Sequence, residues 1–185
     1  MNVYVLSRQE IEHIITSHYK KFNKWALISI YNMSGPLLNE CTKEILRLIG
    51  CHKTLSLKFS DISNTEYYRL INQFKTRAVN RLFLFSTVQA KKIISFVDRI
   101  NTNTTDLVVH CEAGISRSGA VALFACRYLN LDEQQFWQLN KRKGKHKQIQ
   151  PNRYVYDTLY HVSGMKKLYQ SFWQGAISDK LTTKT

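Results

Sequence analysis

Apolar and polar residues alternate along this chain in two periods, which predict short strands and amphipathic helices. A period of two, or a continuous apolar run, predicts β-strands, and these cover residues 2–6, 25–31, 54–59 and 106–110. Apolar residues that recur every three or four positions predict helices, and these cover residues 11–18, 44–49, 67–75, 87–100, 118–129, 132–141 and 153–170. The helical signal is mixed only in residues 67–75.

Polar residues and glycine mark the expected ends of several helices. Ser7 and Glu10 have the spacing of a capping box, in which each side chain binds the backbone amide of the other residue. Gly50 is expected to end the helix over residues 44–49. Asn130 or Asp132 is expected to cap the helix that follows them.

Strands that alternate with helices predict an α/β fold with a mostly parallel central sheet and helices on both of its faces. With 185 residues, two prolines and seven glycines, the chain is expected to form a single domain over residues 1–185. Open sheets of this kind bind their ligands beyond the carboxyl ends of the strands. Functional residues are therefore expected in the loops that follow the strands.

The loop after the fourth predicted strand, residues 111–117, carries the strongest chemical signal, and we call it the cysteine loop. It reads Cys-Glu-Ala-Gly-Ile-Ser-Arg and leads into an apolar helix. The Cys111 thiolate suits attack on phosphorus, and the Arg117 guanidinium can bind two non-bridging oxygens in a fork. A helix N-terminus and a nearby cation both favour the thiolate form. The pattern predicts phosphoryl transfer through a cysteine.

The other residues of the cysteine loop are expected to bind the same phosphate, largely through backbone amides. They are Glu112, Ala113, Gly114, Ile115 and Ser116. Gly114 is expected to let the backbone turn without a side chain entering the cradle. Ser118 is expected to donate a hydrogen bond to the Cys111 sulfur and so improve it as a leaving group. His110 either holds the shape of the loop or is a core histidine without a titrating role.

Phosphoryl transfer to cysteine also needs a proton donor for the leaving oxygen and later a base for water. Asp61 is the candidate, because it follows a predicted strand and should share the carboxyl edge with Cys111. Asp98 is expected to face solvent from a helix. Asp106 is at the opposite end of the Cys111 strand, about 15 Å away at the usual rise per residue. The alternative for Asp61 is a simple turn residue.

Residues 110–118, His-Cys-x5-Arg-Ser, resemble the signature of the cysteine-dependent protein tyrosine phosphatase superfamily. The Ser-Arg-Ser at its end is similar to the dual-specificity branch. Pro151-Asn152 resembles a segment of that branch whose asparagine supports the phosphate loop. The resemblance covers about residues 54–161, and its motifs are highly specific in combination because strand, loop and helix all agree with them.

The resemblance implies a metal-free, cofactor-free phosphatase with a two-step mechanism. Cys111 would form a phosphocysteine, Asp61 would protonate the leaving group and then activate water, and Arg117 would bind the phosphoryl oxygens in both steps. Asp61 stands 50 residues before Cys111, further than the general acid usually does. The extra length falls in residues 65–85, which we interpret as an insertion near the site.

Several alternatives stay open at this stage. Rhodanese-like sulfurtransferases and low-molecular-weight phosphatases also carry a cysteine loop between strand and helix, but with a different motif or a different place in the chain. The protein could also be a module that binds phosphate esters with weak turnover. The substrate could be a phosphoprotein, an inositol phosphate or an RNA 5′-phosphate. The cysteine loop contains Glu112 and no lysine, which favours phosphotyrosine or phosphoserine/threonine in a protein.

Charge and composition add expectations about partners and location. Lysine and arginine number 27 against 13 acidic residues, a formal net charge of +14, which favours anionic partners and leaves nucleic acid among the candidates. The densest basic cluster is residues 141–147. No apolar run is long enough to span a bilayer and no signal peptide is expected at the N-terminus, so we expect a cytoplasmic protein.

Overall fold

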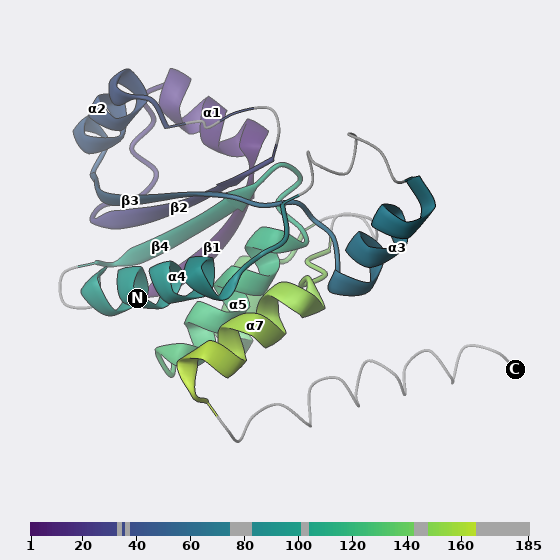
Figure 1. The fold of residues 1–185 in the computed structure, drawn as a ribbon. Helices are drawn as coiled ribbons and strands as arrows, with labels where there is room; N and C mark the ends of the chain where they lie inside the picture. The colour runs from purple at the N-terminus through teal and green to yellow at the C-terminus, as the bar shows by residue number, and fades with distance from the viewer. Residues whose placement is uncertain (33–34, 36–37, 75–82, 101–103, 143–147, 166–185) are drawn as a thin grey trace, which may run out of the picture.

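Four parallel strands form one sheet at the centre of the computed structural model (Figure 1). The structure describes residues 1–32, 35, 38–74, 83–100, 104–142 and 148–165, without the side chains of residues 64, 71 and 74. The strands are β1 (Asn2–Ser7), β2 (Trp25–Tyr31), β3 (Cys51–Lys58) and β4 (Asp106–Cys111). They lie in the order β1-β4-β2-β3, and every neighbouring pair is parallel. The predicted α/β class is confirmed.

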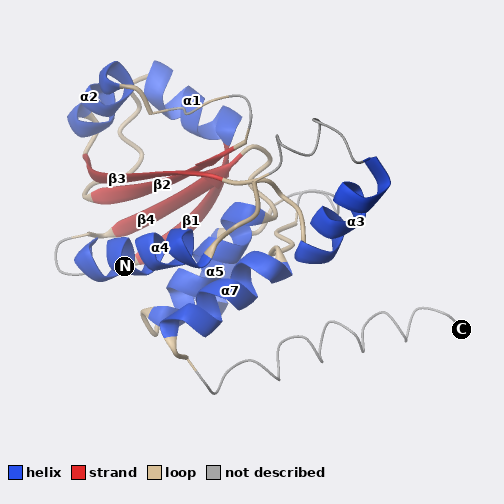
Figure 2. Ribbon diagram, viewed as in Figure 1, coloured by secondary structure: helices blue, strands red, loops and turns tan. Residues whose placement is uncertain are grey.

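Helices cover both faces of the sheet, as Figure 2 shows. The described helices are α1 (Arg8–Thr16), α2 (Glu40–Leu48), α3 (Asn64–Phe74), α4 (Thr87–Ile100), α5 (Arg117–Tyr128), α6 (Glu133–Leu139) and α7 (Arg153–Ser163). Helices α1 and α2 lie on one face, and α4, α5 and α7 lie on the other. Helix α3 stands apart from both layers, at the end of the sheet where the strands finish.

Two hydrophobic clusters hold these layers together. The larger lies between the sheet and the helices α4 to α7, and the smaller lies under α1 and α2. Strands β2 and β4 occupy the middle of the sheet, and their residues are buried almost without exception. A parallel strand covered on both faces requires this continuous burial, which explains why their sequences show no alternation.

The buried side chain of Asn140 forms hydrogen bonds with the backbone of the edge strand β1. The Asn140 amide oxygen accepts a hydrogen bond from the backbone N–H of Val5 at 2.7 Å, and its Nδ2 donates to the Val3 carbonyl at 2.8 Å. Unpaired groups at a sheet edge need such partners when they are buried. Asn140 therefore fixes β1, whose end supports the cysteine loop.

Most predicted elements agree with the structure, but several boundaries differ, among them those of α2, β3 and α7. Helix α2 begins at Glu40 rather than at residue 44, because the Asn39 side chain accepts a hydrogen bond from Thr42 N at 2.7 Å and caps the helix. Strand β3 begins at Cys51, before the predicted start. Helix α7 ends at Ser163, since Gly164 adopts a left-handed conformation with φ +74°. Of the predicted continuation, residues 166–170 lie outside the described residues.

The capping box at the start of α1 is confirmed, with reciprocal bonds between Ser7 and Glu10. The cap of α6 is Asp132. The helix expected near residues 67–75 is α3, while residues 75–82 and the basic residues 143–147 lie outside the described part of the chain. Among the described helices, none is both long and apolar enough to cross a bilayer.

Candidate active site

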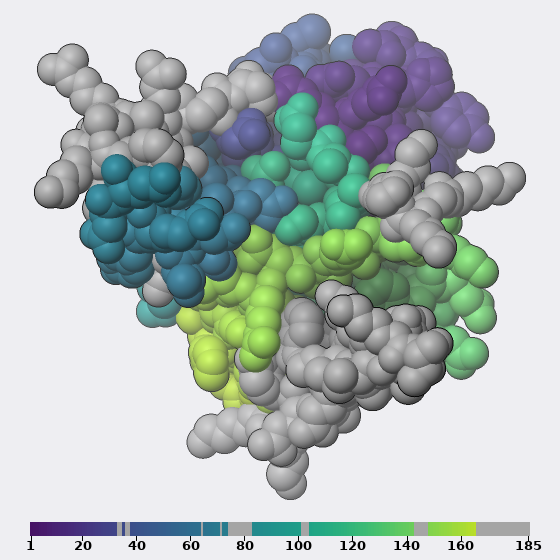
Figure 3. All heavy atoms as spheres, turned by 90° about the vertical axis from the view of Figure 1, so that its right-hand side faces the viewer, coloured from purple at the N-terminus to yellow at the C-terminus, as the bar shows by residue number. Residues whose placement is uncertain are grey.

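The cysteine loop connects the carboxyl end of β4 to the first turn of α5. Cys111 is the last residue of β4 and pairs with Ser7 at the end of β1. Arg117 is the first residue of α5. Figure 3 looks onto this end of the molecule, where the loop lies between α1, α3 and the segment that leads into α7. The loop therefore occupies the edge of the sheet at which parallel α/β folds bind ligands.

The candidate nucleophile is buried and paired with a hydroxyl. Cys111 is 1% exposed, and its Sγ lies 3.0 Å from the Oγ of Ser118 on the first turn of α5. Either atom can be the donor of this bond. When the sulfur is a thiolate, only the hydroxyl can donate, and the bond then stabilises the charge. The expected Cys111–Ser118 contact is present in the structure.

The Arg117 side chain is buried with part of its hydrogen-bonding capacity unused. It is 4% exposed, and its Nη1 donates to the carbonyl of Phe59 at 2.8 Å. Its Nε has no hydrogen-bond partner among the described residues. A buried charged donor without a partner is costly, and such a group calls for an explanation. An anion bound at the cysteine loop would supply the missing acceptor.

Asp61 is brought to the same place from the loop after β3. Its Oδ1 accepts hydrogen bonds from Ser116 Oγ at 2.7 Å and Asn152 Nδ2 at 2.8 Å. Its Oδ2 lies 3.9 Å from Arg117 Nε, and its side chain is 38% exposed. The carboxylate is therefore both accessible and fixed against the cysteine loop, and Ser116 uses its hydroxyl on Asp61 rather than as a side-chain cap of α5.

The segment before α7 supports the cysteine loop through backbone hydrogen bonds. The amides of Gln150 and Asn152 donate to the carbonyls of Ile115 at 3.2 Å and Ser116 at 3.1 Å. The Asn152 side chain also caps α7, because its Oδ1 accepts from Val155 N at 3.1 Å. One asparagine thus joins α7, the cysteine loop and Asp61.

The end of β1 supports the opposite side of the loop. The Arg8 amide donates to the Glu112 carbonyl at 3.1 Å. Gly114 has φ +67°, and a Cβ on it would stand 2.5 Å from Ser7 N and 2.7 Å from Leu6 O. The glycine is required by this close approach to β1 as well as by its positive φ. The expectation that Gly114 lets the backbone turn agrees with this positive φ, and a Cβ at this position would also meet Leu6 and Ser7.

His110 is a core residue whose ring remains neutral. It is 2% exposed, and its Nε2 lies 2.8 Å from the hydroxyl of Ser29 on β2. Burial lowers the pKa of the imidazole to about 4, while a contact with the Cys111 backbone partly opposes this. Near neutral pH the ring therefore carries no charge, which is compatible with both interpretations of His110.

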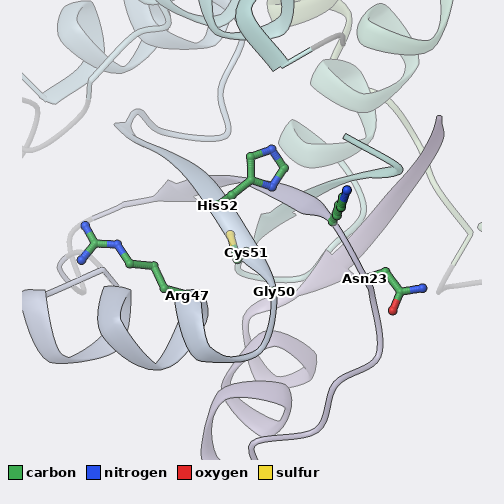
Figure 4. A pocket seen from close by; sticks show the side chains of 6 residues that line it. Asn23, Arg47, Gly50, Cys51 and His52 are labelled. Carbon is green, nitrogen blue, oxygen red and sulfur yellow. The ribbon is translucent and has the colours of Figure 1, made fainter. Parts of the chain in front are cut away.

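Two surface cavities differ in their relation to the loop. One, of about 580 Å³, adjoins the outer side of the cysteine loop and is lined in part by Glu10, Glu112 and Arg142. The other, of about 590 Å³, lies at the amino ends of β2 and β3 and contains none of the predicted site residues. Figure 4 shows that Arg47 and His52, which line it, point to different sides. Its polar groups do not converge on one centre.

The structure thus assembles the four residues predicted to act in catalysis, Asp61, Cys111, Arg117 and Ser118, together with Asn152. The sequence did not predict the contacts that Ser29, Phe59 and Arg142 make. Arg142 Nη2 donates to Val5 O at 3.0 Å and to the Glu10 carboxylate at 2.9 Å, while Nη1 lies 3.5 Å from Ala113 O. Within the described residues, no three His, Cys, Asp or Glu side chains are grouped as metal ligands.

Residues 64–154, just under half of the chain, match the family model described as "Protein-tyrosine phosphatase". This match includes the cysteine loop and Asn152 but not Asp61, and it shows a similarity to that family over this part of the chain. A solved structure described as "Crystal structure of Tk-PTP in the active form" is similar at 12% identity with a TM-score of 0.49, covering 90% of this chain and 94% of that chain. No curated protein matches the chain.

Proposed function

We propose, on the basis of its similarity to the protein-tyrosine phosphatase family, that this chain hydrolyses phosphomonoesters through a phosphocysteine intermediate at Cys111. The observation that carries the proposal is the pairing of a buried thiol with a buried, incompletely bonded guanidinium at the two ends of one loop. The Cys111 sulfur has a hydroxyl partner at 3.0 Å, and the Arg117 Nε has none among the described residues. A phosphate dianion complements both groups.

In the first step, the Cys111 thiolate attacks phosphorus and the bond between phosphorus and the ester oxygen breaks. Asp61, entering in its protonated form, transfers its proton to that oxygen, so the leaving group departs as an alcohol or phenol. In the resting site, the Asp61 carboxyl group contacts Ser116, Asn152 and Arg117, which hold it beside the cysteine loop.

In the second step, water attacks the phosphocysteine and the sulfur–phosphorus bond breaks. The Asp61 carboxylate accepts a proton from the water, and the products are inorganic phosphate and the thiolate. Ser118 donates a hydrogen bond to the sulfur as its negative charge returns. Arg117 binds the phosphoryl oxygens in both steps, and no metal or cofactor takes part.

We propose a phosphorylated protein as the substrate, with phosphotyrosine and also phosphoserine or phosphothreonine as acceptable residues. Two observations support a singly phosphorylated group over an inositol polyphosphate. The cysteine loop contains no lysine. The cavity beside it is lined by two carboxylates, Glu10 and Glu112, and Arg142 in that cavity is already paired with Glu10 at 2.9 Å. A second phosphate there would meet negative charge.

The test compares wild type with Cys111→Ser on an aryl phosphate, a phosphotyrosine peptide, a phosphoserine peptide, an inositol polyphosphate and an RNA 5′-phosphate. Wild type is expected to hydrolyse the aryl phosphate and the peptides fastest. Cys111→Ser is expected to bind the phosphotyrosine peptide without turnover. Hydrolysis that survives Cys111→Ser would rule out the mechanism, and a preference for the inositol phosphate or RNA would rule out the substrate class. Binding with little turnover by wild type would favour a phosphate-ester-binding module.

The cytoplasmic location, the single-domain organisation and an anionic partner for the basic surface remain predictions from the sequence.

A further inference from the structure

We propose that Ser29 is a positioning residue for the reaction at Cys111 and that it acts through its hydrogen bond to His110. This inference rests on the proposed function. It concerns a strand that precedes the cysteine loop by some eighty positions and carries no part of the signature motif, since Ser29 and His110 are separated by 81 residues.

Ser29 is the one hydroxyl in the middle of an otherwise apolar strand. Strand β2 reads Trp-Ala-Leu-Ile-Ser-Ile-Tyr, and Ser29 is 0% exposed. Burying a hydroxyl without a partner costs about 1–3 kcal/mol. The partner is His110, which lies directly opposite in the parallel register of β2 and β4, with Ser29 Oγ and His110 Nε2 2.8 Å apart. The pair is sealed from solvent on both sides, so water cannot replace either group.

The geometry of β4 explains how this bond reaches the nucleophile. Successive side chains of a strand point to opposite faces. Val108 packs in the cluster beneath α1 and α2, whereas Val109 and Cys111 belong to the cluster on the other face. His110 therefore faces α1, and Cys111 faces α5. Fixing the His110 ring on one face fixes the peptide plane between the two residues, and so the direction in which the Cys111 side chain leaves the backbone.

The hydrogen bond between Ser29 and His110 does not depend on ionisation of the imidazole. The charged groups that influence the ring are Arg8 and Glu12 of α1 and Arg117 of α5. Burial dominates over all of them and leaves the imidazole neutral near pH 7, as described above. A neutral imidazole and a hydroxyl can each be donor or acceptor. The bond is therefore a geometric restraint, whose loss should displace Cys111 without altering charge at the site.

The structure supplies a matched control at the other end of the sheet. His52 Nε2 lies 3.0 Å from Thr104 Oγ1, and Thr104 is 7% exposed. Thr104→Val removes a hydroxyl from a histidine just as Ser29→Ala does, but far from the cysteine loop. A loss of activity that is specific to Ser29 cannot then come from a general effect of deleting a buried hydroxyl.

The test measures kcat and KM for an aryl phosphate, inhibition by inorganic phosphate, and alkylation of Cys111 by iodoacetate at one fixed pH. The alkylated peptides are identified by mass spectrometry, with the exposed Cys41 as the internal reference. Because small displacements of reacting groups cost up to about 100-fold, we expect Ser29→Ala to lower kcat about 10-fold. The rate of Cys111 alkylation relative to that of Cys41 should change together with kcat. KM and phosphate inhibition should stay within about twofold of wild type, since Arg117 and the loop amides bind phosphate.

Ser29→Thr, which keeps the hydroxyl, should restore most of the activity, and Thr104→Val should leave it unchanged. In a His110→Ala background, Ser29→Ala should have no further effect. If Ser29→Ala does not fold, Ser29→Cys, a weak hydrogen-bonding isostere, takes its place.

The inference is overturned if the Ser29 variant keeps kcat within twofold of wild type, if Thr104→Val lowers it equally, or if the loss is undiminished in the His110→Ala background. Cys111→Ser is assayed alongside. If it abolishes hydrolysis while the Ser29 results are negative, only the role of Ser29 fails. If it remains active, the proposed function itself fails.

Discussion

Arg117 and Arg127 lie at the two ends of α5, with side chains 4% and 10% exposed, yet they are bonded in opposite ways. Arg127 forms two bonds of 2.8 Å to the Glu133 carboxylate and a third, of 2.9 Å, to the Tyr156 hydroxyl. Arg117 has one short bond, to a backbone carbonyl, and a carboxylate no closer than 3.9 Å.

The difference separates a guanidinium that stabilises the fold from one that, in the proposed function, binds the phosphoryl group. An ion pair with good geometry needs nothing further, whereas a buried charge with an unused donor is a cost that the fold tolerates. Arg117 is therefore expected to contribute to activity and little to stability. Arg127 is expected to contribute to stability and little to activity. Substitutions at the two positions can break or sharpen this contrast.

The largest expected effect is on activity at Arg117. Arg117→Lys keeps the charge but loses the planar fork that binds two phosphoryl oxygens, so kcat/KM should fall about 1000-fold. The free energy of unfolding, measured by urea denaturation, should stay within about 1 kcal/mol of wild type, because no well-formed ion pair is lost. A stability loss as large as that of an Arg127 variant would contradict the comparison.

Asp61, the neighbour of Arg117, should show the next largest effect. Asp61→Asn removes the proton donor, so hydrolysis of a phosphotyrosine peptide should fall about 100-fold. For an aryl phosphate with an activated leaving group, the rate of the first step should fall less, because its oxygen departs without a proton. The pH profile of kcat/KM should also lose its basic limb. An unchanged profile would place the acid elsewhere, with the insertion over residues 65–85 as the next region to search.

Arg127 should give the converse result. Arg127→Ala takes away the bidentate partner of Glu133, which should lower the free energy of unfolding by about 2 kcal/mol, because solvent reaches the Glu133 side chain, 35% exposed, and screens its charge. The kcat of the folded fraction should equal that of wild type. Although burial alone would raise it, the bonds from Arg127 hold the pKa of Glu133 below its usual value, so the ion pair persists at neutral pH. A large fall in kcat with intact stability would show that Arg127 has a role at the site.

At neutral pH the titration of His110 should have no effect on stability, and its contribution should appear only in acid. Its pKa is lowered from 6.5 to about 4 by burial. Between these pH values the unfolded chain holds a proton that the folded chain lacks, so stability should fall as the pH falls, by up to about 3 kcal/mol in all. Urea titrations at a series of pH values should show this slope, and His110→Gln should remove it. An identical slope in both proteins would mean that His110 is not held neutral.

The sequence predicted the fold well where the signal was local. The capping box at Ser7, the bounds of β2 and the bounds of α4 all agree with the structure, because each depends on residues within one or two turns. The end of α7 was missed by several residues, since Gly164 was not recognised as a left-handed cap.

The residues that meet at the candidate site were predictable from the sequence, whereas the contacts that support them were not. Cys111, Arg117 and Ser118 lie within one motif, and the position of Asp61 followed from the common edge of parallel strands. The bonds of Arg117 to Phe59 and of His110 to Ser29 join residues 58 and 81 positions apart. No spacing rule connects such pairs, because they depend on strand order and register, which a single sequence does not reveal.

The most direct test of the phosphocysteine is to trap it. Asp61→Asn lacks the base for the second step, so rapid mixing with an activated aryl phosphate should release one equivalent of phenol in a burst and leave the enzyme phosphorylated. Mass spectrometry of the quenched protein should place the phosphoryl group on Cys111, and the Cys111→Ser variant should show neither burst nor label. A phosphoryl group on another residue, or steady hydrolysis by Cys111→Ser, would contradict the account.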